Sequence, residues 1–359
     1  MQGKQQDICS ILQKIIRERL TPLIDSDYIY LELPYHSNIG DTLIWMGTDH
    51  FLREIPHKCL GQHSTETYDF RPLPQDAVIL LHGGGNFGDI WRQHQNFRLK
   101  VIETYPNNRI IILPQTVYYQ SEDVLKQDVE RMNLHQHLII CARDNQSAEV
   151  LQKAGYSGQM LTLPDMAFCI DRSLLCADRN EVTKDNLLLL RNDKESPQGI
   201  PTTDTASAQM DISDWPNQRE ARRTARRYIR RHTAQQTDAF FQTSFLPSRV
   251  REGVRFVSEY QMVYSTRLHV AILRLLLGMP VKMMNNSYGK NLNFYNTWLK
   301  DCELIGTPNE EEQRALGMAI YVQQQEQKKM KRWKKIYAFI LTFLLLAAMA
   351  IFLVSIPTK

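Results

Sequence analysis

Short apolar runs alternate with helical patterns along most of this chain, and each apolar run ends in a cluster of polar residues. The run Met262–Ser265, for example, leads into Arg267 and His269, and a helical pattern then precedes a second run at Val281–Met284. Strands that alternate with helices in this way predict parallel sheets with helices packed on their faces. Ligands of such sheets bind beyond the carboxyl ends of the strands, so the polar clusters form the candidate site.

The same alternation fills the first half of the chain. Its apolar runs are Tyr28–Leu33, Ala77–Leu81, Arg109–Leu113, Leu138–Cys141 and Met160–Leu163. This number of strands predicts a complete doubly wound domain, and 359 residues leave room for a second one. We therefore expect an α/β protein with two Rossmann-like domains, at residues 1–175 and 176–310.

The C-terminal part has a different composition. Ile336–Ile356 contains no charged residue and is long enough, at about 20 residues, to cross a bilayer, and the basic run Lys328–Lys335 precedes it. This pattern predicts a polar and basic juxtamembrane helix at 311–335 and a transmembrane helix at 336–356. By the positive-inside rule, the protein is expected at the cytoplasmic face of the inner membrane as a single-pass, tail-anchored protein. The alternative is a buried core helix.

Arginines follow one face of a predicted helix between Arg219 and Arg231. They are Arg219, Arg222, Arg223, Arg226, Arg227, Arg230 and Arg231. Such a density of like charge favours an anionic partner, which in a membrane-anchored protein is either lipid headgroups or a lipid-linked diphosphate. A solvated helix face is the alternative. Nucleic acid is not expected, because the arginines show no regular interleaving with aromatic residues and the net charge is only +4.

Two glycine-containing clusters follow predicted strands of the first half. One contains Asn38, Gly40 and Asp41, with Asp41 expected to cap the next helix. The other runs from His82 to Asp89, and its glycines allow a ligand to approach the backbone closely. Its spacing differs from that of the nucleotide-binding GxGxxG motif, and no Walker lysine follows. Ordinary turns and close packing of a helix on the sheet are the alternatives for these clusters.

Eight segments together resemble the bacterial exopolysaccharide pyruvyl transferases. In the order found in that family, they are YHSNIGDTLIWMGTDHFL, LHGGGNFGDIWRQHQNFR, ILPQTVYYQ, ARDNQSAEVL, LPDMAF, LLLRNDKE, STRLHVAIL and NNSYGKNLNFYNTW. They extend over roughly residues 28–300. One departure from the family pattern is Asn285, where the family usually has aspartate, so a role that requires a carboxylate at this position is in doubt.

The resemblance implies a fold similar to that of the GT-B glycosyltransferases, with the site in a central cleft. It implies transfer of pyruvate from phosphoenolpyruvate to two hydroxyls of a sugar in an exopolysaccharide or capsule repeat unit, which gives a cyclic ketal. No metal and no cofactor are expected, and the acceptor is a sugar or a lipid-linked oligosaccharide. The family's Arg-Leu-His element corresponds to Arg267, Leu268 and His269, and its arginine at the end of the first strand of the second domain corresponds to Arg191.

The chemistry of this reaction suits the candidate residues. Phosphoenolpyruvate carries a phosphate and a carboxylate, which favour guanidinium donors, so Arg191, Arg267 and Arg143 are expected to bind it with Lys290 as an additional charge. His269 is expected to act with Arg267 in catalysis as the general acid or base. Residues two apart on a helix point in opposite directions, so Arg267 and His269 can reach one ligand only if the backbone is still extended there.

The acceptor sugar is expected against the glycine-containing clusters of the first domain. The candidate acceptor-binding residues are Asn38, Asp41, His82, Gly84, Gly85, Asn86 and Asp89. Two other functions remain open. A sugar-nucleotide glycosyltransferase on the same fold would need an acidic ribose ligand in the second domain, and none is evident. A non-catalytic, membrane-anchored subunit for polysaccharide assembly would tolerate loss of His269.

Overall fold

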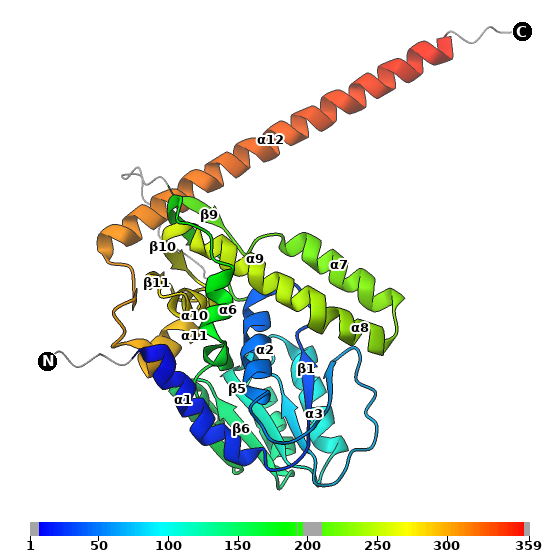
Figure 1. Ribbon diagram of the computed structural model, residues 1–359. Coiled ribbons are helices and arrows are strands. Elements are labelled where there is room, and N and C mark those ends of the chain that lie inside the picture. Colours follow the sequence, from blue (N-terminus) through cyan, green and yellow to red (C-terminus); the bar gives the residue numbers. More distant parts are fainter. Residues whose placement is uncertain (1–6, 192, 197–209, 355–359) are drawn as a thin grey trace, which may run out of the picture. The chain divides into compact units, whose positions relative to one another are not determined.

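Two parallel sheets form the framework of the protein in the computed structural model (Figure 1), which describes residues 7–191, 193–196 and 210–354. Of Gln327 and residues 343–354 it describes only the backbone. Contacts divide the chain into two units, of which the first contains Met1–Gln198 and Ser213–Pro308 and the second Gly199–Ile212 and Asn309–Lys359. The mixed α/β architecture with parallel sheets that the sequence predicts is confirmed, whereas the domain boundaries at residues 175 and 310 stay predictions.

The first sheet has the strand order β2-β1-β3-β5-β6-β7, and all of its pairs are parallel. Its strands are β1 (Tyr28–Leu33), β2 (Cys59–Ser64), β3 (Val78–Leu81), β4 (Gly84–Gly88), β5 (Ile110–Tyr118), β6 (Leu138–Ala142) and β7 (Gln159–Thr162). The short strand β4 continues the line of β3 along β5, because Leu81 pairs with Ile112 and Gly84 with Gln115. The chain order reverses between β1 and β3, which is where doubly wound sheets bind ligands.

Helices cover both faces of this sheet. They are α1 (Ile8–Leu20), α2 (Ile39–Leu52), α3 (Arg92–Thr104), α4 (Glu122–Asn133), α5 (Asn145–Lys153) and α6 (Arg172–Ala177), together with the 3₁₀ turns η1 (Thr21–Leu23) and η2 (Met166–Cys169). The cap of α2 corrects the sequence prediction. Asn38 is the N-cap, and its Oδ1 accepts from the Gly40 N–H at 3.0 Å, whereas Asp41 lies in the first turn. An Asx cap satisfies an amide that has no partner within the helix.

The second sheet has the order β12-β11-β10-β8-β9. Its strands are β8 (Lys184–Leu189), β9 (Asp211–Ser213), β10 (Tyr260–Ser265), β11 (Val281–Met283) and β12 (Ile305–Gly306). The pairs β10·β8, β10·β11 and β11·β12 are parallel. The associated helical segments are α7 (Gln218–Arg231), α8 (Ala234–Phe240), η3 (Phe241–Phe245), α9 (Leu246–Ser258), α10 (Leu268–Leu276), α11 (Lys290–Phe294) and η4 (Tyr295–Leu299).

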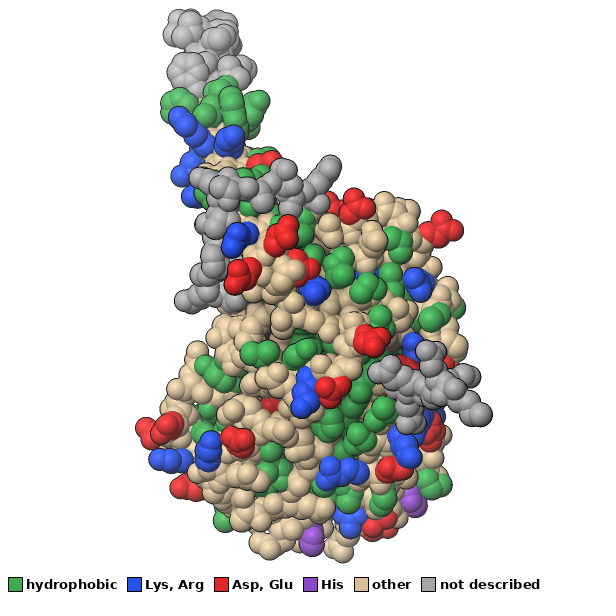
Figure 2. All heavy atoms as spheres, turned by 90° about the vertical axis from the view of Figure 1, so that its left-hand side faces the viewer, with side chains coloured by type: hydrophobic (Ala, Val, Ile, Leu, Met, Phe, Trp, Pro, Cys, Tyr) green, Lys and Arg blue, Asp and Glu red, His purple; other side chains and the backbone are tan. Residues whose placement is uncertain are grey.

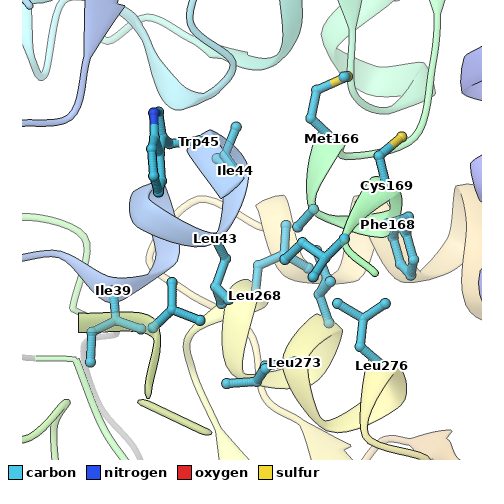
Figure 3. Close-up of a cluster of buried hydrophobic side chains, with 14 of the residues drawn as sticks. Ile39, Leu43, Ile44, Trp45, Met166, Phe168, Cys169, Leu268, Leu273 and Leu276 are labelled. Carbon is cyan, nitrogen blue, oxygen red and sulfur yellow. The ribbon is translucent and has the colours of Figure 1, made fainter. Parts of the chain in front are cut away.

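One apolar cluster joins helices of the two sheets. Side chains of α2, η2 and α10 point toward one another in Figure 3, among them Leu43, Phe168 and Leu268, which are each at most 2% exposed. The backbones approach so closely that a Cβ on Gly47 of α2 would lie 2.0 Å from the carbonyl oxygen of Met166. Only glycine permits this approach, and the packing holds the ends of β1 and β10 in a fixed relation.

A long helix, α12 (Glu310–Val354), carries the basic run, and Figure 2 shows its lysine and arginine side chains gathered below apolar ones. Among the described residues, no helix is long and apolar enough to cross a membrane. The predictions of a transmembrane helix at Ile336–Ile356 and of a tail anchor at the inner membrane are therefore wrong; residues 355 and 356 lie outside the described part. The apolar residues continue the same helix as the basic run, so α12 joins them directly to charged residues.

Candidate active site

A cleft of ≈ 480 Å³ lies at the carboxyl ends of strands from both sheets. The first sheet contributes β4 and the segments after β1, β4 and β6. The second sheet contributes the segments after β8, β9 and β10, and α7 as far as Arg226 and the first residue of α11 complete the lining. The lining residues are His36, Ser37, Asn38, Gly40, Asp41, Gly85, Asn86, Trp91, Gln93, His94, Arg143, Arg191, Asp193, Lys194, Glu195, Trp215, Gln218, Arg222, Arg226, Arg267, Leu268, His269 and Lys290. Most of the residues that the sequence singles out therefore meet in one place.

Arg267 and His269 both reach this cleft because the helix begins between them. Arg267 is the N-cap of α10, with an extended backbone at φ −106° and ψ 118°, and α10 begins at Leu268. The strand before it is anchored, since the Ser265 Oγ accepts from the Arg267 N–H at 3.0 Å. The condition set by helical geometry is met, and the two side chains face one cavity from the positive end of a helix dipole.

His269 is oriented by a buried carboxylate. Its Nε2 lies 3.2 Å from Oδ2 of Asp165, which follows β7 and is fully buried. Burial acts to raise the pKa of Asp165, but His269 and Arg143 hold that pKa well below its usual value. An ionised Asp165 accepts a hydrogen bond, so Nε2 carries the proton and Nδ1 is the nitrogen that can accept one. A Cβ on Gly40 would lie 2.7 Å from this Nδ1, so α2 leaves room for the ring only because residue 40 is glycine.

Four buried cations, hereafter the paired cations, stand beside His269 in the cleft, and each has a carboxylate partner. They are Arg143, Arg191, Arg267 and Lys290. Arg143 donates to Asp165 at 2.7 Å. Arg267 donates to both oxygens of Asp214, at 2.5 and 2.7 Å. Bidentate pairs of this kind hold the planar guanidinium in a defined orientation.

Glu195 connects two of the paired cations. Its Oε2 accepts from Arg191 at 2.7 Å, from the Lys290 ammonium at 2.5 Å and from the Tyr288 hydroxyl at 2.8 Å. Burial acts to raise the pKa of Glu195, but Lys290 and Arg191 hold it far below its usual value. Burial also lowers the pKa of Lys290, to about 8, against the opposing effect of Glu195. Glu195 is therefore the carboxylate that Arg191 and Lys290 share, and Asp193 is a second partner of Arg191 at 2.8 Å.

The first sheet lines the other wall with the predicted acceptor residues Asn38, Asp41, Gly85 and Asn86. The Asn38 Nδ2 donates to Asp41 at 2.7 Å. Burial acts to raise the pKa of Asp41, and His36 and His269 lower it below the usual value. The charge of Asp41 is thus stabilised by two histidines, one from the segment after β1 and one from α10.

His82, Gly84 and Asp89 do not line the cleft. His82 is 2% exposed, its Nδ1 bonds the Tyr30 hydroxyl, and burial lowers its pKa to about 3. Gly84 has φ +130°, which permits the break between β3 and β4. Asp89 accepts from the Gln120 and Ser121 N–H groups at 2.9 and 3.0 Å. Their contacts are thus with neighbouring parts of the first sheet and its loops, and a role in acceptor binding stays a prediction for all three.

Several residues of the cleft have no clear signal in the sequence. Asp193 and Glu195 line the cleft, whereas Asp165 and Asp214 pair with its cations without lining it. His36, Arg222 and Arg226 add further positive or titratable groups to the lining. Asp165 ends a strand like the predicted residues, and this position is the one clue that could have identified it. Arg222 and Arg226 belong to the arginine stripe, and a helical pattern alone does not indicate that the helix borders the cleft.

Comparison with known proteins assigns the chain to a family. The sequence profile described as "Polysaccharide pyruvyl transferase" matches residues 38–288. The chain belongs to the polysaccharide pyruvyl transferase family. This pyruvyl transferase family member is 29% identical over 310 residues to EpsO of Bacillus subtilis (strain 168), which is provisionally named a pyruvyl transferase; the match covers 79% of this chain and 91% of EpsO. It is 28% identical over 291 residues to "Pyruvyl transferase 1" of Schizosaccharomyces pombe (strain 972 / ATCC 24843), covering 76% of this chain and 70% of that protein.

The fold of this family member also has a counterpart among solved structures. A functionally uncharacterised protein of Klebsiella pneumoniae subsp. pneumoniae NTUH-K2044 superimposes with a TM-score of 0.54 at 21% identity, over 82% of this chain and 96% of that one. The likeness concerns the fold alone. Asn285, the departure from the family pattern, accepts from the Leu292 N–H through Oδ1 at 3.4 Å and does not line the cleft. An amide oxygen can therefore serve this local contact without a carboxylate.

Proposed function

We propose that this protein transfers pyruvate from phosphoenolpyruvate to two hydroxyls of a polysaccharide or repeat-unit sugar, forming a cyclic ketal. The observation that carries the proposal is the grouping of the paired cations around His269 in one cleft. A donor with a phosphate and a carboxylate needs several guanidinium or ammonium partners, and a cleft formed by two parallel sheets can hold two substrates face to face. Membership of the pyruvyl transferase family supports the same reaction. The proposal involves no metal or other cofactor.

In the proposed reaction, C3 of phosphoenolpyruvate gains a proton, which makes C2 electrophilic. One sugar hydroxyl then adds to C2, the bond between C2 and the phosphate oxygen breaks, and inorganic phosphate leaves. The second hydroxyl adds to the same carbon and closes the ring. Of the two hydroxyl protons, one is balanced by the proton gained at C3 and the other leaves with phosphate. His269 Nδ1 accepts the proton that a sugar hydroxyl loses, because the hydrogen bond to Asp165 occupies Nε2.

Binding of the donor requires the paired cations to exchange partners. In the structure their N–H groups are directed at carboxylates, with Arg191 shared between Asp193 and Glu195. A phosphate group can replace one of these carboxylates, because it offers oxygen acceptors of the same charge sign and similar geometry. Arg267 is suited to the phosphate or the carboxylate of the donor, since its fork lies at the N-terminus of α10, next to His269.

The acceptor is proposed to lie against Asn38, Asp41, Gly85 and Asn86 on the opposite wall. These residues offer amide, carboxylate and backbone groups to sugar hydroxyls. A Cβ on Gly85 would lie 3.0 Å from the Lys290 ammonium and 3.3 Å from an Arg143 nitrogen. The two walls therefore approach each other closely near the paired cations, where donor and acceptor must meet.

The test is incubation of the purified protein with phosphoenolpyruvate and a lipid-linked oligosaccharide extract. Phosphate release and the gain of a pyruvate-sized mass on the glycan are followed together. Both signals are expected to fall by about 10²- to 10⁴-fold in His269→Ala and in Arg267→Ala. His137→Ala, an exposed histidine away from the cleft, is the matched control and is expected to retain full activity. Asp165→Asn is expected to lower kcat more than it raises KM, because the amide favours the wrong tautomer of His269.

Other outcomes would contradict the proposal. Turnover of sugar nucleotides in place of phosphoenolpyruvate would identify a glycosyltransferase on this fold. Unchanged ketal formation in His269→Ala would mean that another group moves the proton. Absence of both signals, together with no protection of the protein by phosphoenolpyruvate against thermal unfolding, would favour a non-catalytic role in polysaccharide assembly.

A further inference from the structure

The arginine stripe of α7 consists of exposed cations without partners. All seven arginines between Arg219 and Arg231 are exposed, and among the described residues none has a hydrogen bond or an ion pair. The opposite face of α7 packs inward through the buried Ala221 and Ala225, and Tyr228 stacks on Phe240 of α8, its neighbour in Figure 1. Helix packing therefore fixes which side the arginines present, while their like charges repel one another at i, i+4 spacing.

One row of α7 borders the cleft. Gln218, Arg222 and Arg226 all line it, and their spacing of four residues places them one turn apart on a single line. Arg222 and Arg226 are hereafter the α7 pair. Burial lowers the pKa of His36, and the positive charge of Arg222 lowers it further, against the opposing effect of Asp41. The Gln218 Nε2 is buried and has no hydrogen-bond partner among the described residues. Two guanidinium forks and an unsatisfied amide donor thus face the same side of the cavity.

We propose that Gln218, Arg222 and Arg226 form a subsite for the diphosphate of a glycosyl diphosphate acceptor, an inference that rests on the proposed pyruvyl transfer. Two arginines one turn apart match two consecutive phosphate groups, and each fork can bind two oxygens of one group. The buried Gln218 amide supplies a further donor to the same anion. The paired cations already account for both anionic groups of phosphoenolpyruvate, so the α7 pair is left for the second substrate.

The position of the subsite also fits an acceptor bound at its reducing end. Arg222, His36, Asp41 and His269 all line the cleft, and His36 Nε2 lies 3.5 Å from Asp41. A sugar on Asp41 can therefore place its hydroxyls toward His269 and its anomeric phosphate toward α7. The remaining arginines of the stripe extend the positive potential beyond the cleft and attract the diphosphate.

The test is the affinity of the full chain for inorganic pyrophosphate, measured by isothermal titration calorimetry in excess phosphoenolpyruvate and at fixed ionic strength. The variant is Arg222→Gln/Arg226→Gln. The matched control, Arg223→Gln/Arg227→Gln, removes the same charge from the same helix at positions outside the cleft. We expect pyrophosphate to bind about 10- to 100-fold more weakly to the variant and within about twofold of normal to the control. Binding of phosphoenolpyruvate alone is expected to stay unchanged in both.

Each outcome decides the inference. Equal weakening in the control would show a nonspecific charge effect and overturn the subsite. A loss of phosphoenolpyruvate affinity in the Arg222→Gln/Arg226→Gln variant would assign the two arginines to the donor and overturn it as well. If pyrophosphate behaves as expected but phosphoenolpyruvate binds to no form of the protein, the diphosphate site stands and the proposed pyruvyl transfer fails. Titration with farnesyl diphosphate and with UDP then distinguishes a lipid-linked from a nucleotide-linked acceptor, according to which binds more tightly than pyrophosphate.

Discussion

Two groups of cations in the cleft carry the same sign of charge but differ in burial and in ion pairing. The paired cations are buried and each has a carboxylate within 2.7 Å, whereas the α7 pair is exposed and has no such partner in the part of the chain that the structure describes. Burial explains the difference, because a charge without a counterion is expensive inside a protein and inexpensive in water. The chain must neutralise the first group in order to fold, but it can leave the second free.

The difference determines how each group can bind an anion. A ligand at the paired cations must displace a carboxylate, so it gains affinity only where its geometry matches the existing network. A ligand at the α7 pair displaces only water, so its attraction is less specific and is screened by salt. The first arrangement suits recognition of a small donor, and the second suits capture of a charged group on a larger acceptor.

The largest effect is expected from removing the carboxylate that neutralises two of the paired cations. Glu195→Ala leaves Arg191 and Lys290 without their shared partner in a buried place, and we expect a loss of about 3–5 kcal/mol in the free energy of unfolding, measured with urea. The control is Glu220→Ala on α7, an exposed carboxylate, which should change stability by less than about 0.5 kcal/mol. Phosphoenolpyruvate is expected to stabilise the Glu195→Ala variant more than the unmodified protein. If Glu195→Ala is as stable as its parent, the two cations are not held by Glu195.

The next effect concerns the space beside His269. In Gly40→Ala the new methyl group would lie 2.7 Å from Nδ1 and 3.0 Å from Cγ, so the ring must move. We expect kcat to fall by about 10²-fold, since a displacement of about 1 Å can have that effect, while phosphoenolpyruvate binding is retained. Stability should be little changed, because alanine is favoured over glycine within a helix. A Gly40→Ala variant with normal kcat would mean that the ring position is not critical for the reaction.

The strands and the positions of most cleft residues could be predicted from the sequence because both follow from local rules. Apolar runs end in polar clusters, and parallel sheets bring these ends together, so the order of residues along the chain is enough to assign Arg143, Arg191 and Arg267 to one site. His82 shows the limit of this rule. It follows a strand, but its side chain turns into the core toward Tyr30, and side-chain direction is set by tertiary packing.

The partners of the cations could not be predicted from the sequence. Glu195 and Asp214 lie on segments after β8 and before α7, and their ion pairs depend on how those segments return to the cleft. The location of the arginine stripe beside the cleft is likewise a tertiary feature. At the C-terminus the apolar run was interpreted in isolation, whereas in the structure it continues the same helix as the basic run, and no helix of the described residues is long and apolar enough to cross a membrane.

A smaller effect is expected from the titration of Lys290, whose pKa burial lowers to about 8. Between pH 7 and pH 9 the ammonium changes from about nine-tenths charged to about one-tenth, so KM for phosphoenolpyruvate should rise by up to about tenfold across this interval. In Lys290→Arg the charge persists, and the rise should disappear. The measurement is a KM profile against pH at constant ionic strength. A flat profile in the unmodified protein would show that Lys290 does not contribute its charge to donor binding.

The smallest effect on stability is expected when an arginine of the α7 pair is replaced by glutamine. Arg226→Gln removes an exposed cation without a partner and relieves repulsion from Arg222 and Arg230, so stability should stay the same or rise by at most about 0.5 kcal/mol at low salt. Glutamine and arginine have similar helix propensities, so backbone preference does not obscure the result. Urea unfolding at low and at high sodium chloride provides the measurement, and the gain should vanish at high salt because the repulsion is screened.

Arg191→Gln, made among the paired cations, is the contrasting variant. It should lower the free energy of unfolding by about 3 kcal/mol or more at both salt concentrations, because it leaves part of the charge of Asp193 and Glu195 buried without a partner. A loss of more than about 1 kcal/mol in Arg226→Gln would require a partner for Arg226, and the contrast between the two groups of cations would then no longer hold.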